Sequence, residues 1–244
     1  MERWLNLLER RFGRYAVPHL ALFVVTPKII FLLKVALQPS SLQPMMENFV
    51  LVPALVLEGE LWRLFTFLVI PPTFQAIWFL LYAYLTYLYC SGLEQAWGAF
   101  RLNVYILIAW FATVVSTFLA YFLNEKFVLL DAFYVETTLF LAFAAVYPEF
   151  VFQLFFILPV KVKYLAMVAW AMAGFQFMQG GWSEVYQYAH RVVLLGIYCN
   201  YLLFFGARHY KYIRDRIEAQ RRRKKWQEAM RKPPRHQESD LDKH

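Results

Sequence analysis

Lys28, Glu136 and His190 are ionisable side chains inside stretches of sequence that are mostly apolar. A charge inside a membrane is costly, so such a residue needs a partner and often marks a functional site. We expect Glu136 and His190 to form a hydrogen-bonded lock between two helices, with Lys28 as a candidate third member. Two other uses stay open: a polar pocket that binds a transmembrane segment of another protein, and the handling of protons or a metal.

The composition indicates which elements must hold these residues. Aliphatic, aromatic, Met and Cys residues make up 60% of the 244 residues and only 17% are charged, against about 25% in a typical soluble domain. One small core cannot bury so much apolar surface, so lipid must cover part of it. We therefore expect an all-α integral membrane protein, with six spans at about 17–37, 74–92, 102–123, 132–147, 163–178 and 186–205.

The two ends of the chain differ from this membrane domain, which we place at 17–206. Residues 1–16 have the spacing of an amphipathic helix in the membrane interface. Residues 207–244 form a basic, mostly helical tail that holds 13 of the 25 Lys and Arg residues. Because basic residues favour the cytoplasmic side, both termini are expected there. The short loops and the absence of a cleavable signal peptide indicate a bacterial inner membrane.

The connections between spans give further expectations. We interpret residues 38–68 as a loop partly embedded at the membrane interface, and 150–158 as an apolar connector. Gly180 and Gly181 should break the chain before the last span, and Gly206 should end that span.

Three short motifs lie at span boundaries. The first is Glu-Leu-Trp-Arg-Leu-Phe-Thr-Phe at 60–67, which contains Trp62 and Arg63. The second, at 92–101, runs Gly-Leu-Glu-Gln-Ala-Trp-Gly-Ala-Phe-Arg, and the third, at 159–164, runs Pro-Val-Lys-Val-Lys-Tyr. In their order and spacing they resemble the rhomboid superfamily, including the derlins. The resemblance covers about 18–206 and implies a six-helix rhomboid-like bundle. In that fold Gly92, Glu94, Gly98, Arg101, Pro159 and Lys161 have structural roles.

The second motif also has a physical interpretation of its own. Glu94 and Arg101 are seven residues apart across a turn that bears Gly92 and Gly98. They can meet at the cytoplasmic surface and tie two spans together. A partly buried pair of this kind fixes geometry more than it adds stability, so the motif is architectural.

The resemblance also implies where catalytic residues would lie. Active rhomboids resemble one another in a Gly-x-Ser-Gly segment on the fourth span and a His on the sixth. Aligning the family's small residues with Ala142 and Ala144 puts Glu136 in the place of the Ser, while His190 fits the His. A carboxylate cannot form an acyl-enzyme in the serine manner. This dyad is therefore degenerate, and no catalytic residue is expected.

The expected function is non-catalytic. Like rhomboid pseudoproteases and derlins, the chain would bind transmembrane segments of client proteins during quality control, assembly or trafficking. Trp62, Arg63, Lys28, Glu136 and His190 are the candidate contact residues. An intramembrane protease that uses Thr137 or Thr138 stays open as an enzyme alternative, as does a transporter or channel. No cofactor or metal is expected, because the five histidines are scattered without a spacing such as His-Glu-x-x-His.

The basic tail has its own candidate partner. Residues 221–225 are Arg-Arg-Arg-Lys-Lys, followed by Trp226. Beside a cytoplasmic membrane face such a cluster attracts anionic lipid. Nucleic acid or a ribosome is an alternative partner, and a solvated helix that only sets the topology is an interpretation of equal standing.

Overall fold

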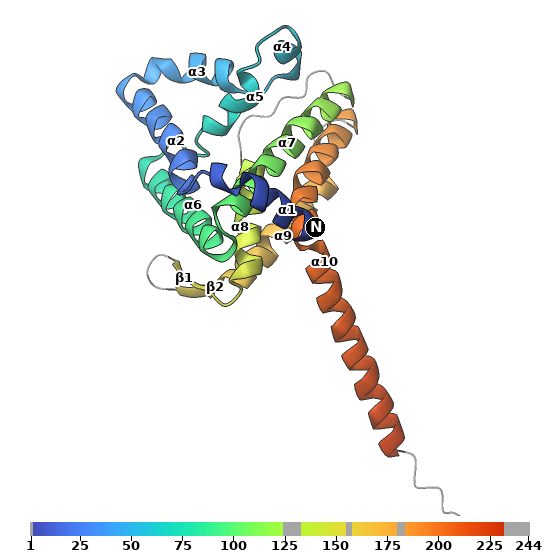
Figure 1. The fold of residues 1–244 in the computed structure, drawn as a ribbon. Helices are drawn as coiled ribbons and strands as arrows, with labels where there is room; N and C mark the ends of the chain where they lie inside the picture. Colours follow the sequence, from blue (N-terminus) through green and yellow to red (C-terminus); the bar gives the residue numbers. More distant parts are fainter. Residues whose placement is uncertain (1, 124–132, 155–157, 180–183, 232–244) are drawn as a thin grey trace, which may run out of the picture. The chain divides into compact units, whose positions relative to one another are not determined.

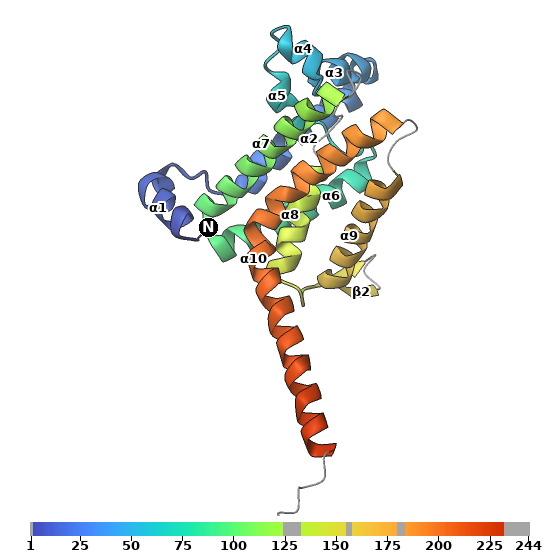
Figure 2. The ribbon, with the colours of Figure 1, turned by 90° about the vertical axis from the view of Figure 1, so that its right-hand side faces the viewer.

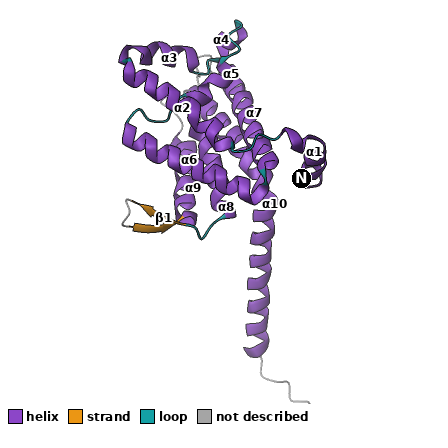
Figure 3. Cartoon of the chain, turned by 60° about the vertical axis from the view of Figure 1, so that its left-hand side comes forward, coloured by secondary structure: helices purple, strands orange, loops and turns teal. Residues whose placement is uncertain are grey.

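A computed structural model describes residues 2–123, 133–154, 158–179 and 184–231 of the chain (Figures 1 and 3). The described residues are mostly helical, at 84%. Within the described residues, four helical segments are long and apolar enough to cross a membrane. They are α2 (Leu20–Leu37), α6 (Ala76–Trp97), α7 (Ala99–Leu123) and the part Tyr188–Gly206 of α10 (Glu184–Arg231). These segments indicate a multi-pass membrane protein.

The other two expected spans are helical but shorter. They form α8 (Phe133–Val146) and α9 (Val162–Gln179), with apolar stretches of Val135–Val146 and Val162–Met178. A helix of 14 residues, as in α8, is about 21 Å long at 1.5 Å per residue, less than the roughly 30 Å of a bilayer core. Helices therefore occur at all six expected positions, whereas four segments among the described residues are long and apolar enough to be spans.

The chain forms two units, Met1–Phe204 and Phe205–His244. In the first unit, α8 packs against α6, α7 and α9, and α2 packs against α6 (Figure 2). The second unit contains the rest of α10. The helix does not end at Gly206 as expected but continues to Arg231. Glu218 forms ion pairs with Arg214 and Arg222, one turn away on either side, and such pairs support an exposed helix.

The expected interfacial loop at 38–68 is a series of short helices. They are η2 (Pro39–Ser41), α3 (Leu42–Phe49), α4 (Pro53–Leu57), α5 (Arg63–Thr66) and η3 (Phe67–Val69). Arg63, only 3% exposed, fixes this segment because its Nη1 donates to the carbonyl oxygens of Glu47 (2.6 Å) and Val50 (3.0 Å). Its Nε also pairs with Glu60 at 2.5 Å. The neighbouring Trp62 is exposed.

The expected connector at 150–158 is wrong in part, because it contains strand. Strands β1 (Val151–Leu154) and β2 (Leu158–Lys161) form an antiparallel hairpin in which Val151 lies opposite Lys161. Val and Phe favour the extended backbone of a sheet. Pairing of the two strands gives the N–H and C=O groups of that backbone their hydrogen-bond partners. The glycine pair at 180–181 and the last residues, 232–244, lie outside the described residues.

An ion-pair clamp holds the base of this hairpin. The carboxylate of Glu149 accepts from Lys161 Nζ at 2.7 Å and from Lys163 Nζ at 2.6 Å. These two hydrogen bonds, with the attraction of the two ammonium groups, lower the pKa of Glu149 from 4.5 to about 2. The lowered pKa means that the clamp favours the folded hairpin above pH 4.5 and is lost as the pH falls through about 2.

We therefore expect the carboxyl carbon signal of Glu149 in an NMR pH titration to have its midpoint near 2. In the variant Lys161→Met/Lys163→Met the midpoint should return to about 4.5. The single variant Lys34→Met, on another helix, is the matched control and should leave the midpoint unchanged. A wild-type midpoint near 4.5 would contradict the clamp.

Candidate functional site

A cluster of three polar side chains joins α2, α6 and α8 inside the first unit. Lys28 Nζ forms an ion pair with Glu136 Oε1 and donates to the carbonyl oxygen of Ile70 at 3.3 Å. Tyr82 Oη donates to the same Glu136 Oε1 at 2.6 Å. Lys28 is 1% exposed and Glu136 is 13% exposed. The two opposite charges therefore form an ion pair without net charge, in which Lys28 is buried and Glu136 is partly buried.

Local sequence explains why Lys28 needs this partner. Lys28 follows Pro27 in the middle of α2, about 12 Å along a helix that begins at Leu20. At that depth its ammonium group cannot easily reach water, and an intramembrane charge is tolerated only beside a partner. The Tyr82 ring adds a cation–π contact, 5.4 Å from Lys28 Nζ to the ring centroid. The sequence left open whether Lys28 pairs with Glu136, and the structure forms this pair.

His190 occupies a different place. It lies half-buried in α10, beside Ala189, which is fully buried. Ala189 packs with Val193 and Ile197 in a core cluster that includes Ala120 of α7 and Leu51, Val56 and Phe67 of the interfacial segment. The structure thus gives Glu136 the partners Lys28 and Tyr82, and the expected Glu136–His190 lock stays a prediction. Sequence reasoning did not find Tyr82, because a tyrosine among many apolar residues carries no distinguishing signal.

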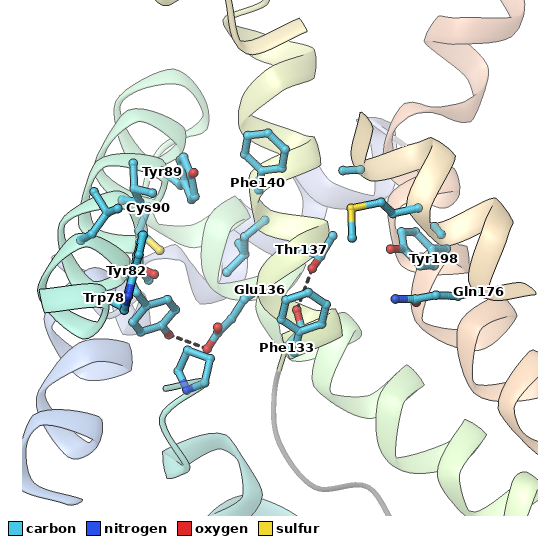
Figure 4. Close-up of a pocket in the computed structure, with 18 residues that line it drawn as sticks. Trp78, Tyr82, Tyr89, Cys90, Phe133, Glu136, Thr137, Phe140, Gln176 and Tyr198 are labelled. Carbon is cyan, nitrogen blue, oxygen red and sulfur yellow. Dashed lines mark hydrogen bonds between the residues drawn. The ribbon is translucent and has the colours of Figure 1, made fainter. Parts of the chain in front are cut away.

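A cavity of about 370 Å³ opens beside the polar cluster. Figure 4 shows α6 residues on one side, Gln176 and Tyr198 on the other, and α8 residues between them. Most of its wall is apolar or aromatic. Its lining includes Trp78, Tyr82, Glu136, Thr137, Ala169 and Met172.

Glu136 presents a hydrogen-bond acceptor to this cavity. Lys28 and Tyr82 both donate to its Oε1 (Figure 4 marks the tyrosine bond). Within the part of the chain that the structure describes, no donor reaches Oε2. A carboxylate oxygen that no protein donor reaches can still accept a hydrogen bond from another group. A ligand in the cavity that brings a donor to Glu136 can therefore gain a hydrogen bond.

The two threonines proposed for nucleophilic chemistry are engaged in their own helix. Thr137 Oγ1 donates to the carbonyl oxygen of Phe133 at 2.8 Å, and Thr138 Oγ1 donates to that of Val135 at 2.7 Å. Thr138 is fully buried, whereas Thr137 lines the cavity. A hydroxyl that donates to a backbone carbonyl is not positioned to give its proton to a general base. This geometry favours a binding site over a catalytic one.

The motif at 92–101 fixes the turn between α6 and α7. Gly98 has a positive φ of 84°, a conformation that glycine adopts without strain. A Cβ on Gly92 would lie 2.7 Å from Cε2 of Phe143, so this glycine lets α6 approach α8 closely. The structural roles expected for Gly92 and Gly98 agree with these contacts.

Glu94 and Arg101 instead contact the N-terminal segment. Glu94 Oε1 accepts from the backbone N–H of His19 at 3.0 Å, just before α2. Arg101 Nε pairs with Glu9 Oε2 at 3.0 Å. Glu9 belongs to α1 (Glu2–Phe12), and η1 (Gly13–Tyr15) follows this helix. The turn thus anchors α1 and the start of α2. Glu94 and Arg101 do this through His19 and Glu9, partners that cannot be identified from the motif alone.

The third motif serves the hairpin. Pro159 lies opposite Gln153 in the strand register, and Lys161 belongs to the clamp on Glu149. Across the described residues, no group of three His, Cys, Asp or Glu side chains is close enough to hold a metal.

Comparisons with known proteins add no family to these observations. No family model matches the chain. No curated protein and no solved structure matches it either. The structure itself shows a mostly helical, multi-pass membrane protein. Its cavity is lined by Glu136, whose carboxylate forms an ion pair with Lys28.

Proposed function

We propose that the protein is a non-catalytic, rhomboid-like membrane protein that binds transmembrane segments of other membrane proteins. One observation supports this most directly: a mostly apolar cavity is lined by Glu136, and among the described residues no donor reaches its Oε2. In this proposal six helices span a bacterial inner membrane, with both ends in the cytoplasm. The client's fate would be quality control, assembly or trafficking.

The position of the cavity favours a helical client. Along α6 its lining extends from Trp78 to Cys90, a distance of about 18 Å at 1.5 Å per residue. A volume of about 370 Å³ holds a few side chains but not a whole helix. A client helix would therefore lie along the opening and insert side chains from one face. In lipid, association of this kind depends on close packing and interhelical hydrogen bonds.

A proteolytic role fits the site less well. Glu136 occupies the position where the rhomboid resemblance puts the serine, and it is already paired with Lys28. Thr137 and Thr138 donate to backbone carbonyls of α8. His190 is not among the residues that line the cavity. These contacts support recognition without peptide hydrolysis.

Photo-crosslinking can test the proposal. A photoreactive residue at Met172, in the cavity wall, should crosslink single-span peptides with a polyleucine core when the full chain is reconstituted in phosphatidylcholine vesicles. The same probe at Leu107, which is exposed on α7 and does not line the cavity, is the control. Ala169→Trp should fill the cavity and lower crosslinking from Met172 by about tenfold, a cost near 1.4 kcal/mol.

Ala171→Trp, on an exposed part of the same helix, is the matched control and should leave crosslinking unchanged. Equal crosslinking in both tryptophan variants would rule out the cavity as the client site. Peptide fragments that appear with wild-type protein and disappear in Thr137→Val would favour the protease instead.

A further inference from the structure

We infer that the cavity selects transmembrane segments that carry an uncharged hydrogen-bond donor, as in Asn, Gln, Ser or Thr, and disfavours segments with a charged side chain at that depth. This inference rests on the proposed function, because it names the class of client that the same site takes. Two features support it, the neutral Lys28–Glu136 pair and the acceptor oxygen Oε2.

The ion pair makes the site electrically neutral. Lys28 is 1% exposed and also donates to the carbonyl oxygen of Ile70. A client lysine or arginine could pair with Glu136 only by competing with Lys28. That exchange would leave the Lys28 ammonium group buried without its carboxylate, which is strongly unfavourable. A cationic client therefore gains little from this site.

An anionic client meets a different obstacle. A client aspartate or glutamate in the cavity would lie near the Glu136 carboxylate. Like charges repel strongly where water is scarce. Lys28 cannot offset this repulsion, because it is almost fully buried and its ammonium group already contacts Glu136 and Ile70.

An uncharged donor avoids both costs. An amide or hydroxyl group can donate to Oε2 while Lys28 and Tyr82 keep their bonds to Oε1. In lipid, that same group on an isolated client helix is unsatisfied or weakly satisfied. Binding therefore gives both partners a hydrogen bond that neither has alone. The rest of the client needs only apolar side chains, since the cavity wall is mostly apolar.

The test compares four polyleucine peptides that differ at one central residue: Leu, Asn, Lys or Asp. Binding to full-length protein in phosphatidylcholine vesicles is followed by energy transfer between a donor-labelled peptide and an acceptor on the protein. The Asn peptide should bind about tenfold more tightly than the Leu peptide, because it adds a hydrogen bond to a charged acceptor. The Lys and Asp peptides should bind no better than the Leu peptide.

Variants of the ion pair make the test specific. In Lys28→Met, Glu136 lacks its cation, so the preference should move to the Lys peptide, whose ammonium group replaces the missing one. If Lys28→Met does not fold, Lys28→Met/Glu136→Leu serves instead. That double variant removes both the charges and the acceptor, and its preference for Asn over Leu should fall to about one. Lys34→Met, exposed on the same helix, should keep the wild-type preference.

The outcomes separate the inference from the proposed function. If no peptide binds, or if Ala169→Trp weakens no peptide, the proposed function fails. If Ala169→Trp weakens all of them but wild type binds Asn and Leu peptides equally, only the inference fails. Tighter binding of Lys or Asp than of Asn would also overturn it. So would displacement of every peptide by dioleoylglycerol, which would identify a lipid hydroxyl as the occupant.

Discussion

Replacing Lys28 by methionine should lower the free energy of unfolding by about 3–5 kcal/mol, the usual cost of removing one partner of a buried ion pair. Met keeps most of the volume of the lysine side chain, so the loss comes from the charge and not from a cavity. Glu136 would then retain Tyr82 as its donor but no neighbouring cation. Unfolding of the detergent-solubilised protein, followed by circular dichroism, measures the effect.

Two comparisons isolate the ion pair. Lys34→Met removes an exposed lysine from the same helix, α2, and should change the stability by less than about 0.5 kcal/mol. Lys28→Met/Glu136→Leu removes both charges and should be more stable than Lys28→Met alone, because no buried charge is left unpaired. If the double variant is the less stable of the two, the charges contribute independently and the pair does not couple α2 to α8.

Gly196→Ala should also destabilise the bundle, by about 1–3 kcal/mol, as overpacking of a close contact does. Gly196 lies on α10 where the helix meets α7. A Cβ at this position would overlap the Cβ of Ser116. Ser116 has little freedom to move, because its hydroxyl donates to the carbonyl oxygens of Ala112 (2.7 Å) and Thr113 (3.1 Å). The two helices must therefore separate or tilt.

Gly174→Ala is the matched control for that change. Gly174 also lies in a helix, α9, but a Cβ there meets nothing within 4 Å. Alanine is a better helix former than glycine by about 1 kcal/mol, so this variant should be as stable as wild type or more stable. Thermal unfolding in the same detergent compares the two. Equal melting temperatures for Gly196→Ala and wild type would mean that α7 and α10 are not in tight contact.

The helices were predictable from the sequence because their signals are local. An apolar run such as the one from Leu20 to Leu37 specifies a membrane helix by its length and composition. All six expected helices occur, and five of them end within about five residues of the predicted bounds, whereas α10 continues to Arg231. The hairpin at Val151–Lys161 was missed, because a short apolar run fits a connector or a strand equally well. Gly206 did not end α10, since a glycine inside a helix only weakens it.

From the sequence, the functional site could be predicted only as a set of charged residues that each require a partner. The cost of a buried charge already implied that Lys28 and Glu136 must each be paired. Their pairing joins residues 108 positions apart, and it depends on how α2 and α8 are rotated and how closely they approach. For the same reason Glu94 and Arg101, seven residues apart, contact His19 and Glu9.

The sequence by itself determined the apolar helices, the basic tail and the intramembrane charges, because each follows from the composition of a continuous segment. Only the tertiary structure decided that Tyr82 and Lys28 share one oxygen of Glu136 and that Glu136 lines the cavity. Hydrogen bonds have strict distance and angle requirements. Side chains from three helices meet those requirements only after the helices have packed.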